Sequence, residues 1–149
     1  MKYADFSQFI RPEVQGCPDY MIERAVRDSA VDFCTRTDVY VAEPEFVTIV
    51  QNVNEYDLSI DEGSELNHIL DIFDNTTKLK PVSYSVLLGA LGNESTTGTP
   101  QYYAQRDNTQ FYLAPIPSAS GSYRVLYSLK PSSTSTSIPD TIGKEYREA

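Results

Sequence analysis

The chain has 149 residues, 40% of them hydrophobic and 22% charged, which suits one globular domain with a buried core. Its 21 acidic and 12 basic residues leave a net charge of −9, which argues against a surface that binds nucleic acid phosphates. The apolar runs are far shorter than the roughly 20 residues that span a bilayer, and the N-terminal residues show no secretory signal.

The clearest predicted helix covers residues 18–36, with Pro18 in the first turn, where a missing N–H costs nothing. Small and apolar residues recur at helical spacing and predict one stripe on a core: Ile22, Ala25, Val26, Ser29, Ala30 and Phe33. Charged residues fall on the other side of this helix. Residues 3–10, before it, are expected to form a short helical turn or a strand.

The two cysteines, Cys17 and Cys34, are separated by about four turns of the predicted helix. That separation places their Cα atoms beyond the reach of a disulfide. Both are expected to be half-buried thiols that fill small apolar spaces, which suits folding in a reducing compartment.

Two short strands are predicted over 45–53 and 56–60, where β-branched residues alternate loosely with polar ones. Asn54–Glu55 is the expected turn between them. An acidic, solvated turn over 61–65 then leads to a third strand over 68–74.

A short helix is predicted over 84–91, because Ser83 is a suitable N-cap and an apolar run follows it. A turn over 75–79 precedes this helix. A polar loop over 92–100 follows it, and we expect that loop to be mobile because it holds two glycines and no apolar anchor.

A hairpin is predicted for the tyrosine-rich part of the chain, with strands over 102–105 and 110–113 and a turn between them. The run 123–129 alternates cleanly and predicts a return strand, with Tyr123, Val125, Tyr127 and Leu129 on one face. We expect these strands to form a three-stranded meander. Its tyrosines would pair across strands and keep their hydroxyls in water.

Residues 131–140 have the composition of a polar linker, and a C-terminal helix is predicted to begin at Asp140 and run on through 140–149. Such a short helix is marginal alone, so we expect either that it docks on another surface or that the helix continues beyond the sequence given. Together the elements predict a single α+β domain over 1–149. Its helices would pack on a small, mostly antiparallel sheet.

No catalytic, metal or cofactor site is predicted. His68 is the one histidine, and we expect it on the surface at the start of a strand. A zinc site needs three or four ligands, and one histidine with two distant cysteines does not supply them. The acidic run around 57–65 lacks the spacing of a calcium-binding loop, and no phosphate-binding glycine motif occurs.

The order of the segments is more informative than any single site. Five of them follow one another along the chain: PDYMIERAVRDSAVDFCTRTDVY, KLKPVS, PQYYAQRDNTQFYLAPIP, YRVLYSLKPSS and IPDTIGKEYREA. This ordered set resembles the head-to-tail adaptor (connector) proteins of tailed bacteriophages, and the resemblance spans almost the whole chain.

The resemblance implies a structural virion protein that forms a ring, usually twelve-fold, between capsid and tail. Its implied partners are other copies of itself, the portal protein, and a tail or nozzle protein. Genomic DNA would pass through the lumen without specific binding, and an acidic subunit suits such a channel. The implied location is the neck of the virion, after assembly in the host cytoplasm, with no membrane and no cofactor involved.

Four polar segments are the expected interfaces: the charged side of the first long helix, the loop after the second, the serine-rich linker and the C-terminal segment. Their residues are Glu23, Arg24, Arg27, Asp28, Asn93, Glu94, Ser95, Thr96, Ser132, Ser133, Thr134, Tyr146 and Arg147. The charged helix offers both signs for a head-to-tail contact between copies.

Three alternatives stay open. Another neck protein, a stopper or a tail terminator, would share the ring and the acidic channel. A small β-rich carbohydrate-binding module would use exposed tyrosines such as Tyr103 and Tyr112 as a platform. An enzyme comes last, and His68→Ala is expected to leave function intact.

Overall fold

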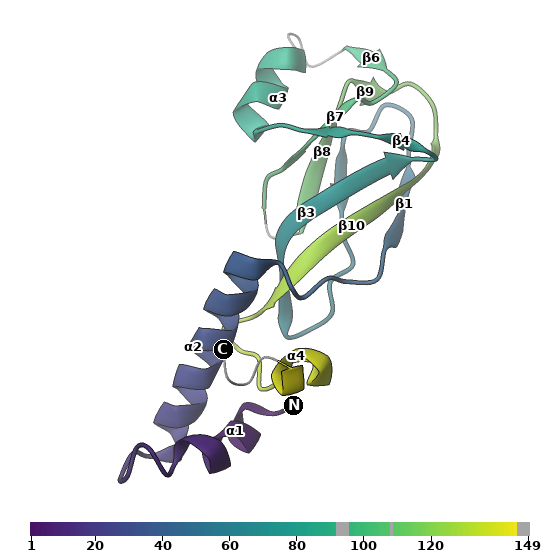
Figure 1. Ribbon diagram of the computed structural model, residues 1–149. Coiled ribbons are helices and arrows are strands. Elements are labelled where there is room, and N and C mark those ends of the chain that lie inside the picture. The colour runs from purple at the N-terminus through teal and green to yellow at the C-terminus, as the bar shows by residue number, and fades with distance from the viewer. Residues whose placement is uncertain (92–95, 108, 146–149) are drawn as a thin grey trace. The chain divides into compact units, whose positions relative to one another are not determined.

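The computed structural model describes residues 1–91, 96–107 and 109–145, and it has helices together with mostly antiparallel strands (Figure 1). This confirms the predicted α+β fold class. The chain groups into two compact units, of which the first holds Met1–Tyr40, Asp61–Asn67 and Leu129–Ala149, and the second holds Val41–Ile60 and His68–Ser128. The single adaptor-like domain stays a prediction, and each unit is described on its own.

The first unit is built on a helical hairpin of α1 (Tyr3–Ile10) and α2 (Asp19–Thr37), which contact one another and run in opposite directions (Figure 1). Pro18 is the N-cap of α2, and Asp38 ends the helix in the left-handed region with φ 52°, where its N–H donates to the Cys34 carbonyl at 3.1 Å. The long helix was therefore predicted to within a residue at each end, and the short one also forms.

The core of the first unit joins the two ends of the described chain. Tyr3, Cys34, Ile138 and Ile142 are all buried and pack in one cluster, with Val26 and Ala30 partly buried against it. Of the predicted α2 stripe, Ile22 is buried, whereas Ala25 and Ser29 are exposed. Cys17 is half-buried as expected, but Cys34 is fully buried, and both thiols are free.

The serine-rich segment after residue 131 lies against the N-terminal residues. The Tyr3 N–H donates to the Thr136 carbonyl at 3.1 Å, and the Ile138 N–H donates to the Met1 carbonyl at 2.9 Å. The hydroxyls of Tyr3 and Ser135 share a buried hydrogen bond of 2.8 Å. A polar composition is thus compatible with an ordered path, because backbone and hydroxyl groups find partners there.

Helix α4 (Asp140–Glu145) follows this segment and confirms the predicted helix start at Asp140. Gly143 is buried in it, and a Cβ added at that position would lie 3.0 Å from the Met1 Cβ. A larger residue there would crowd the side chains of Met1 and Ile138, so the close approach favours glycine.

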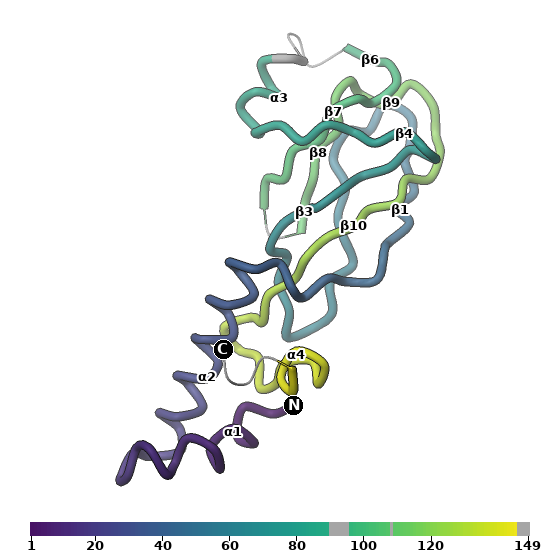
Figure 2. Tube along the Cα trace, viewed as in Figure 1, coloured from purple at the N-terminus to yellow at the C-terminus, as the bar shows by residue number. Residues whose placement is uncertain are grey.

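Most residues of two four-stranded sheets belong to the second unit. The first has the order β1-β10-β3-β4, and its strands are β1 (Glu45–Ile49), β10 (Gly121–Pro131), β3 (Ser64–Asp74) and β4 (Thr77–Lys78). Strand β1 pairs antiparallel with β10, and Phe46 lies opposite Arg124. In Figure 2, β10 lies between β1 and β3, which leaves β1 as an edge strand.

The other sheet has the order β2-β8-β7-β5, and its strands are β2 (Glu55–Asp57), β8 (Gln110–Ala114), β7 (Tyr102–Gln105) and β5 (Lys80–Pro81). β7 and β8 form the predicted hairpin. Helix α3 (Tyr84–Leu91) contacts both, and its Val86 N–H reaches the Ser83 Oγ at 3.4 Å, as the N-cap prediction required. β6 (Thr97–Gly98) and β9 (Ile116–Pro117) form a small parallel ladder.

The predicted three-stranded meander is wrong. β10 does not return beside β8 but pairs with β1 and β3 in the other sheet. Pro115 and Pro117 have no N–H to donate, and the chain between them pairs with β6 before it turns. The prolines therefore end the hairpin sheet, and the next strand enters a different one.

Two local predictions also need correction. The strand predicted over 45–53 ends at Ile49, because a turn follows and Asn52 adopts φ 65°, outside the β region. The acidic turn predicted over 61–65 is shorter, since β3 already begins at Ser64. Gly63, with φ 86°, takes the left-handed conformation that this turn requires.

Several tyrosines of the second unit are buried and bonded inside the protein, so their hydroxyls do not stay in water as expected. The Tyr56 hydroxyl donates to the Val53 carbonyl at 2.5 Å, and the Tyr127 hydroxyl donates to the Glu45 carboxylate at 3.2 Å. Burial is the main cause that raises the pKa of Tyr103 and of Tyr123 to about 12. Nearby carboxylates add to the rise, from Asp71 and Asp74 respectively.

The raised tyrosine pKa values predict a loss of stability in alkali. Tyr103 and Tyr123 stay protonated in the fold up to a pKa of about 12, whereas an unfolded tyrosine ionises near 10. Their contribution to the free energy of unfolding is therefore complete below about pH 10, and it falls as the pH rises toward 12. At about pH 11 we expect each to lower the free energy of unfolding by about 1 kcal/mol.

Urea unfolding at about pH 8 and about pH 11 measures this loss. In Tyr103→Phe the loss should be smaller, and in Tyr20→Phe, where the ring is exposed, it should match the wild type. An equal loss in all three proteins would contradict the assignment to buried tyrosines.

The stacked pair Tyr56 and Phe111 predicts a second stability effect. Phe111 is fully buried, and its ring lies 5.7 Å from that of Tyr56. Phe111→Ala should lower the free energy of unfolding by about 3–5 kcal/mol, because it leaves a cavity in the core. Tyr20→Ala removes an exposed ring and should cost less than about 0.5 kcal/mol. Comparable losses in urea unfolding would show that Phe111 is not a core residue.

Candidate functional site

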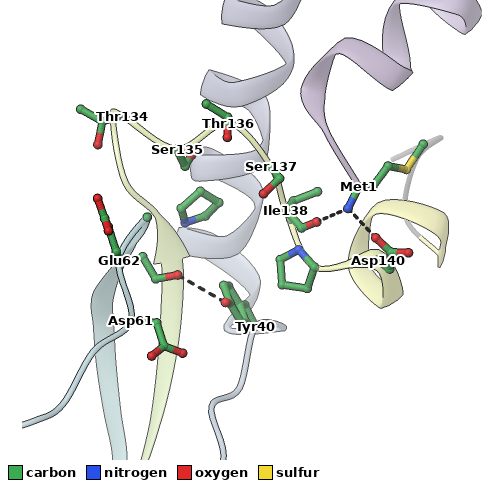
Figure 3. A pocket seen from close by; sticks show the side chains of 14 residues that line it. Met1, Tyr40, Asp61, Glu62, Thr134, Ser135, Thr136, Ser137, Ile138 and Asp140 are labelled. Atoms are coloured by element: carbon green, nitrogen blue, oxygen red, sulfur yellow. Dashed lines mark hydrogen bonds and ion pairs between the residues drawn. The ribbon is translucent and has the colours of Figure 1, made fainter.

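A polar pocket of about 680 Å³ lies within the first unit (Figure 3). Its lining combines hydroxyls of residues 134–137 with the carboxylates of Asp61, Glu62 and Asp140. The hydroxyls of Tyr40 and Ser64 share a hydrogen bond of 3.3 Å on one wall, which leaves less of their polar surface for a ligand.

The terminal ammonium of Met1 occupies the other side of this pocket. It donates to the Ile138 carbonyl at 2.6 Å and to the Asp140 carboxylate at 2.5 Å (Figure 3). The pKa of Asp140 is lowered, first by the hydrogen bond from this ammonium and then by one from Lys144. The Asp140 carboxylate is thus already neutralised by the protein.

The chemistry available in this pocket is limited. Among residues 1–91, 96–107 and 109–145, no cluster of three His, Cys, Asp or Glu side chains could hold a metal ion. The Asp61 and Glu62 side chains are exposed, as the prediction of a solvated acidic turn required. We therefore regard this pocket as a structural junction of the unit.

An apolar opening lies along the helices of the first unit. This groove of about 620 Å³ is formed by α1, α2 and α4. Its apolar lining includes Phe6, Ile10, Val14, Cys17, Met21, Ile22, Ala25, Val26, Phe33 and Ile142, and it also contains the charged residues Asp32 and Arg36. We call it the helix groove.

Exposed apolar side chains continue the helix groove across the surface of the same unit. Phe9, Val14, Tyr20 and Met21 are all exposed along α1, the connection and the start of α2. A contiguous apolar surface of this kind marks a site of protein contact more often than a site of catalysis.

The second unit has an exposed apolar surface of its own on β1. Val47 and Ile49 point into the core, so the alternation of the strand leaves Phe46, Thr48 and Val50 exposed. Phe46 is 71% exposed, although it is a large aromatic residue. Its cross-strand neighbour is Arg124. The guanidinium carbon of Arg124 lies over the Phe73 ring, 5.0 Å from the ring centroid, and not over Phe46.

The geometry described above therefore consists of exposed surfaces. The family model described as SU10 adaptor protein matches residues 1–149, the whole chain. The chain belongs to this adaptor family. The resemblance to phage head-to-tail adaptors is thereby confirmed, and the protein is a bacteriophage adaptor, a structural component of the virion. No curated protein matches the chain.

Three further observations concern functions other than an adaptor's. Tyr103 and Tyr112, the predicted carbohydrate platform, are buried, so this adaptor does not offer them to a saccharide. His68 is exposed, as predicted, but it lies within β3 and not at the start of the strand. Within the part of the chain that the structure describes, every helix is too short or too polar to cross a bilayer.

The charged side of α2 lies on the surface, where an interface was predicted. Glu23, Arg24 and Asp28 are exposed, and Arg27 is partly exposed. Both guanidinium groups approach the same carboxylate, with Arg24 at 3.7 Å and Arg27 at 3.8 Å from Asp28. Such exposed pairs contribute little to stability, so they are free to exchange partners on assembly.

The other predicted interface residues have mixed positions. Thr96, Ser133 and Thr134 are exposed, whereas Ser132 is buried and its hydroxyl shares a hydrogen bond of 3.1 Å with that of Thr134. The remaining ones lie outside the described residues: Asn93, Glu94, Ser95, Tyr146 and Arg147.

The helix groove and Phe46 were not predicted as interfaces. Phe46 was assigned to a strand, and Ile10, Val14 and Cys17 lie where the sequence shows no regular spacing. One signal was available: Met21 and Tyr20 are large apolar residues outside the predicted stripe of α2.

The two cysteines of this adaptor predict a test of the groove's accessibility. Cys17 lines the helix groove and is partly exposed, whereas Cys34 is buried, and burial raises the pKa of its thiol to about 11. Iodoacetamide at about pH 8 should therefore alkylate Cys34 at least about a hundredfold more slowly than Cys17. Both should react at similar rates in urea, as peptide mass spectrometry would show. Equal native rates would contradict the burial of Cys34.

Proposed function

We propose that this adaptor assembles into a ring that joins the portal vertex of the capsid to the tail. The ring is twelve-fold, and its partners are further copies of the chain, the portal protein and a tail or nozzle protein. Its place is the neck of the virion, it assembles in the host cytoplasm, and it needs no cofactor. The genome passes through the lumen without specific binding.

The observation that carries this proposal is the exposed apolar surface of a chain that belongs to an adaptor family. The helix groove is open, and Tyr20 and Met21 beside it are 71% and 50% exposed. A monomer rarely leaves so much contiguous apolar surface in water. Burial against another protein is the function that this surface supports best.

Charge supports the proposal in a second way. The net charge of −9 makes adsorption of DNA to the adaptor unfavourable, which suits a channel that the genome must cross. The side of α2 with Glu23, Arg24, Arg27 and Asp28 carries both signs, and so it can meet a neighbouring copy without net repulsion.

Negative-stain imaging of the purified adaptor, alone and mixed with the portal protein, tests this function. We expect rings with a central opening, or a new layer on the portal particle that the portal alone lacks. The layer should form with the full chain and fail to form when the adaptor is first unfolded in urea. A persistent monomer that adds no density to the portal would overturn the proposal.

A further inference from the structure

Two unpartnered apolar features on the described surface differ in shape. The helix groove is concave, and it belongs to the first unit. Phe46 projects from an edge strand of the second unit with 71% of its surface exposed, and Val50 is exposed four residues further on. One feature can receive a side chain, and the other can supply one.

We propose that Phe46 of one copy inserts into the helix groove of the next copy. This inference rests on the proposed function, because it names the contact through which a ring would form. The occupant of the groove is thus a second copy of this chain, bound through the exposed face of β1.

The difference between the two surfaces decides the kind of assembly. A surface that pairs with itself stops at a dimer, whereas a projection that fits a groove elsewhere on the molecule repeats from copy to copy. A growing assembly still offers one free Phe46 at one end and one free groove at the other. Addition continues until the last groove meets the first Phe46 and the ring closes.

The lining of the groove suits an aromatic ring. Phe6, Met21 and the Cys17 thiol are among its surfaces, and sulfur atoms contact aromatic rings favourably. Its volume of about 620 Å³ leaves room for Val50 beside Phe46. Buried aromatic residues are the usual anchors of protein interfaces, and Phe46 and Tyr20 are the most exposed of the described large hydrophobic residues, at 71% each.

The charges beside each surface are compatible with the contact. Asp32 and Arg36 line the helix groove, while Glu43 and Arg124 lie near Phe46 along the chain and across the strand. Glu45 adds a second carboxylate beside Phe46, and in the groove Asp32 and Arg36 already form an ion pair of 2.9 Å. α2 as a whole carries four carboxylates and three guanidinium groups, so it repels a copy far less than the net charge of −9 suggests.

Three variants test the contact, and none alters a buried residue. Phe46→Ala removes the projecting ring, and Ala25→Trp fills the groove from its exposed wall on α2. Val86→Ala is the control, because Val86 is an exposed apolar residue of α3, 56% exposed, that lies in neither surface. Circular dichroism and urea unfolding establish that all three fold like the wild type.

Mass photometry over a concentration series, with and without portal protein, measures assembly. Phe46→Ala and Ala25→Trp should each raise the concentration at half assembly by at least about tenfold, as loss of an anchor residue does. Val86→Ala should assemble like the wild type. Wild-type assembly in the first two variants would overturn the inference, and so would an equal defect in all three.

Mixing the two defective variants gives the sharper test. The Phe46→Ala chain keeps an open groove, and the Ala25→Trp chain keeps its Phe46, so one good contact is left between them. At a concentration at which each variant alone is monomeric, we expect the mixture to form a one-to-one heterodimer that grows no further. Absence of the heterodimer would overturn the pairing of Phe46 with the groove.

The outcome for the wild type separates this inference from the proposed function. If the wild-type adaptor neither assembles nor adds to the portal, the ring function fails, and the Phe46 contact fails with it. If the wild type assembles and the variants do so equally well, the ring function stands and the Phe46 contact alone is wrong.

Discussion

Contacts between residues 1–3 and 135–142 hold the first unit together. The hydroxyl pair of Tyr3 and Ser135, the backbone bonds beside it and the cluster with Cys34, Ile138 and Ile142 join segments that are more than a hundred residues apart. Closing such a long loop costs conformational entropy, which the buried apolar contacts must offset. The position of α1 and α4 against α2, and with it the helix groove, depends on this junction.

The second unit meets a different constraint. Pro115 and Pro117 end the tyrosine-rich hairpin, and β10 crosses to the centre of the other sheet, where Val125 and Tyr127 are buried. A central place for β10 leaves β1 at the edge of that sheet. Phe46 is exposed because the side chains of β1 alternate: Val47 and Ile49 lie in the core, and Phe46 points outward.

These surfaces suit a bacteriophage adaptor. The chain matches the adaptor family model over residues 1–149. An adaptor acts by binding its neighbours, and what it needs from the fold is a set of exposed faces on rigid elements. Most tyrosines with raised pKa values, such as Tyr103 and Tyr123, serve the interior of the sheets. Aromatic content therefore reflects the packing of a small β-rich unit, and the contact surfaces lie elsewhere.

The sequence by itself determined the local elements: α2, α3 and the β7–β8 hairpin follow from residue spacing, an N-cap serine and turn residues that act within a few positions. Only the tertiary structure decided which strands pair, that Tyr103 and Tyr112 are buried, and that apolar residues of α1, α2 and α4 border one groove. The reason is physical. Spacing along the chain reports one face of one element, whereas pairing and burial depend on contacts between distant segments.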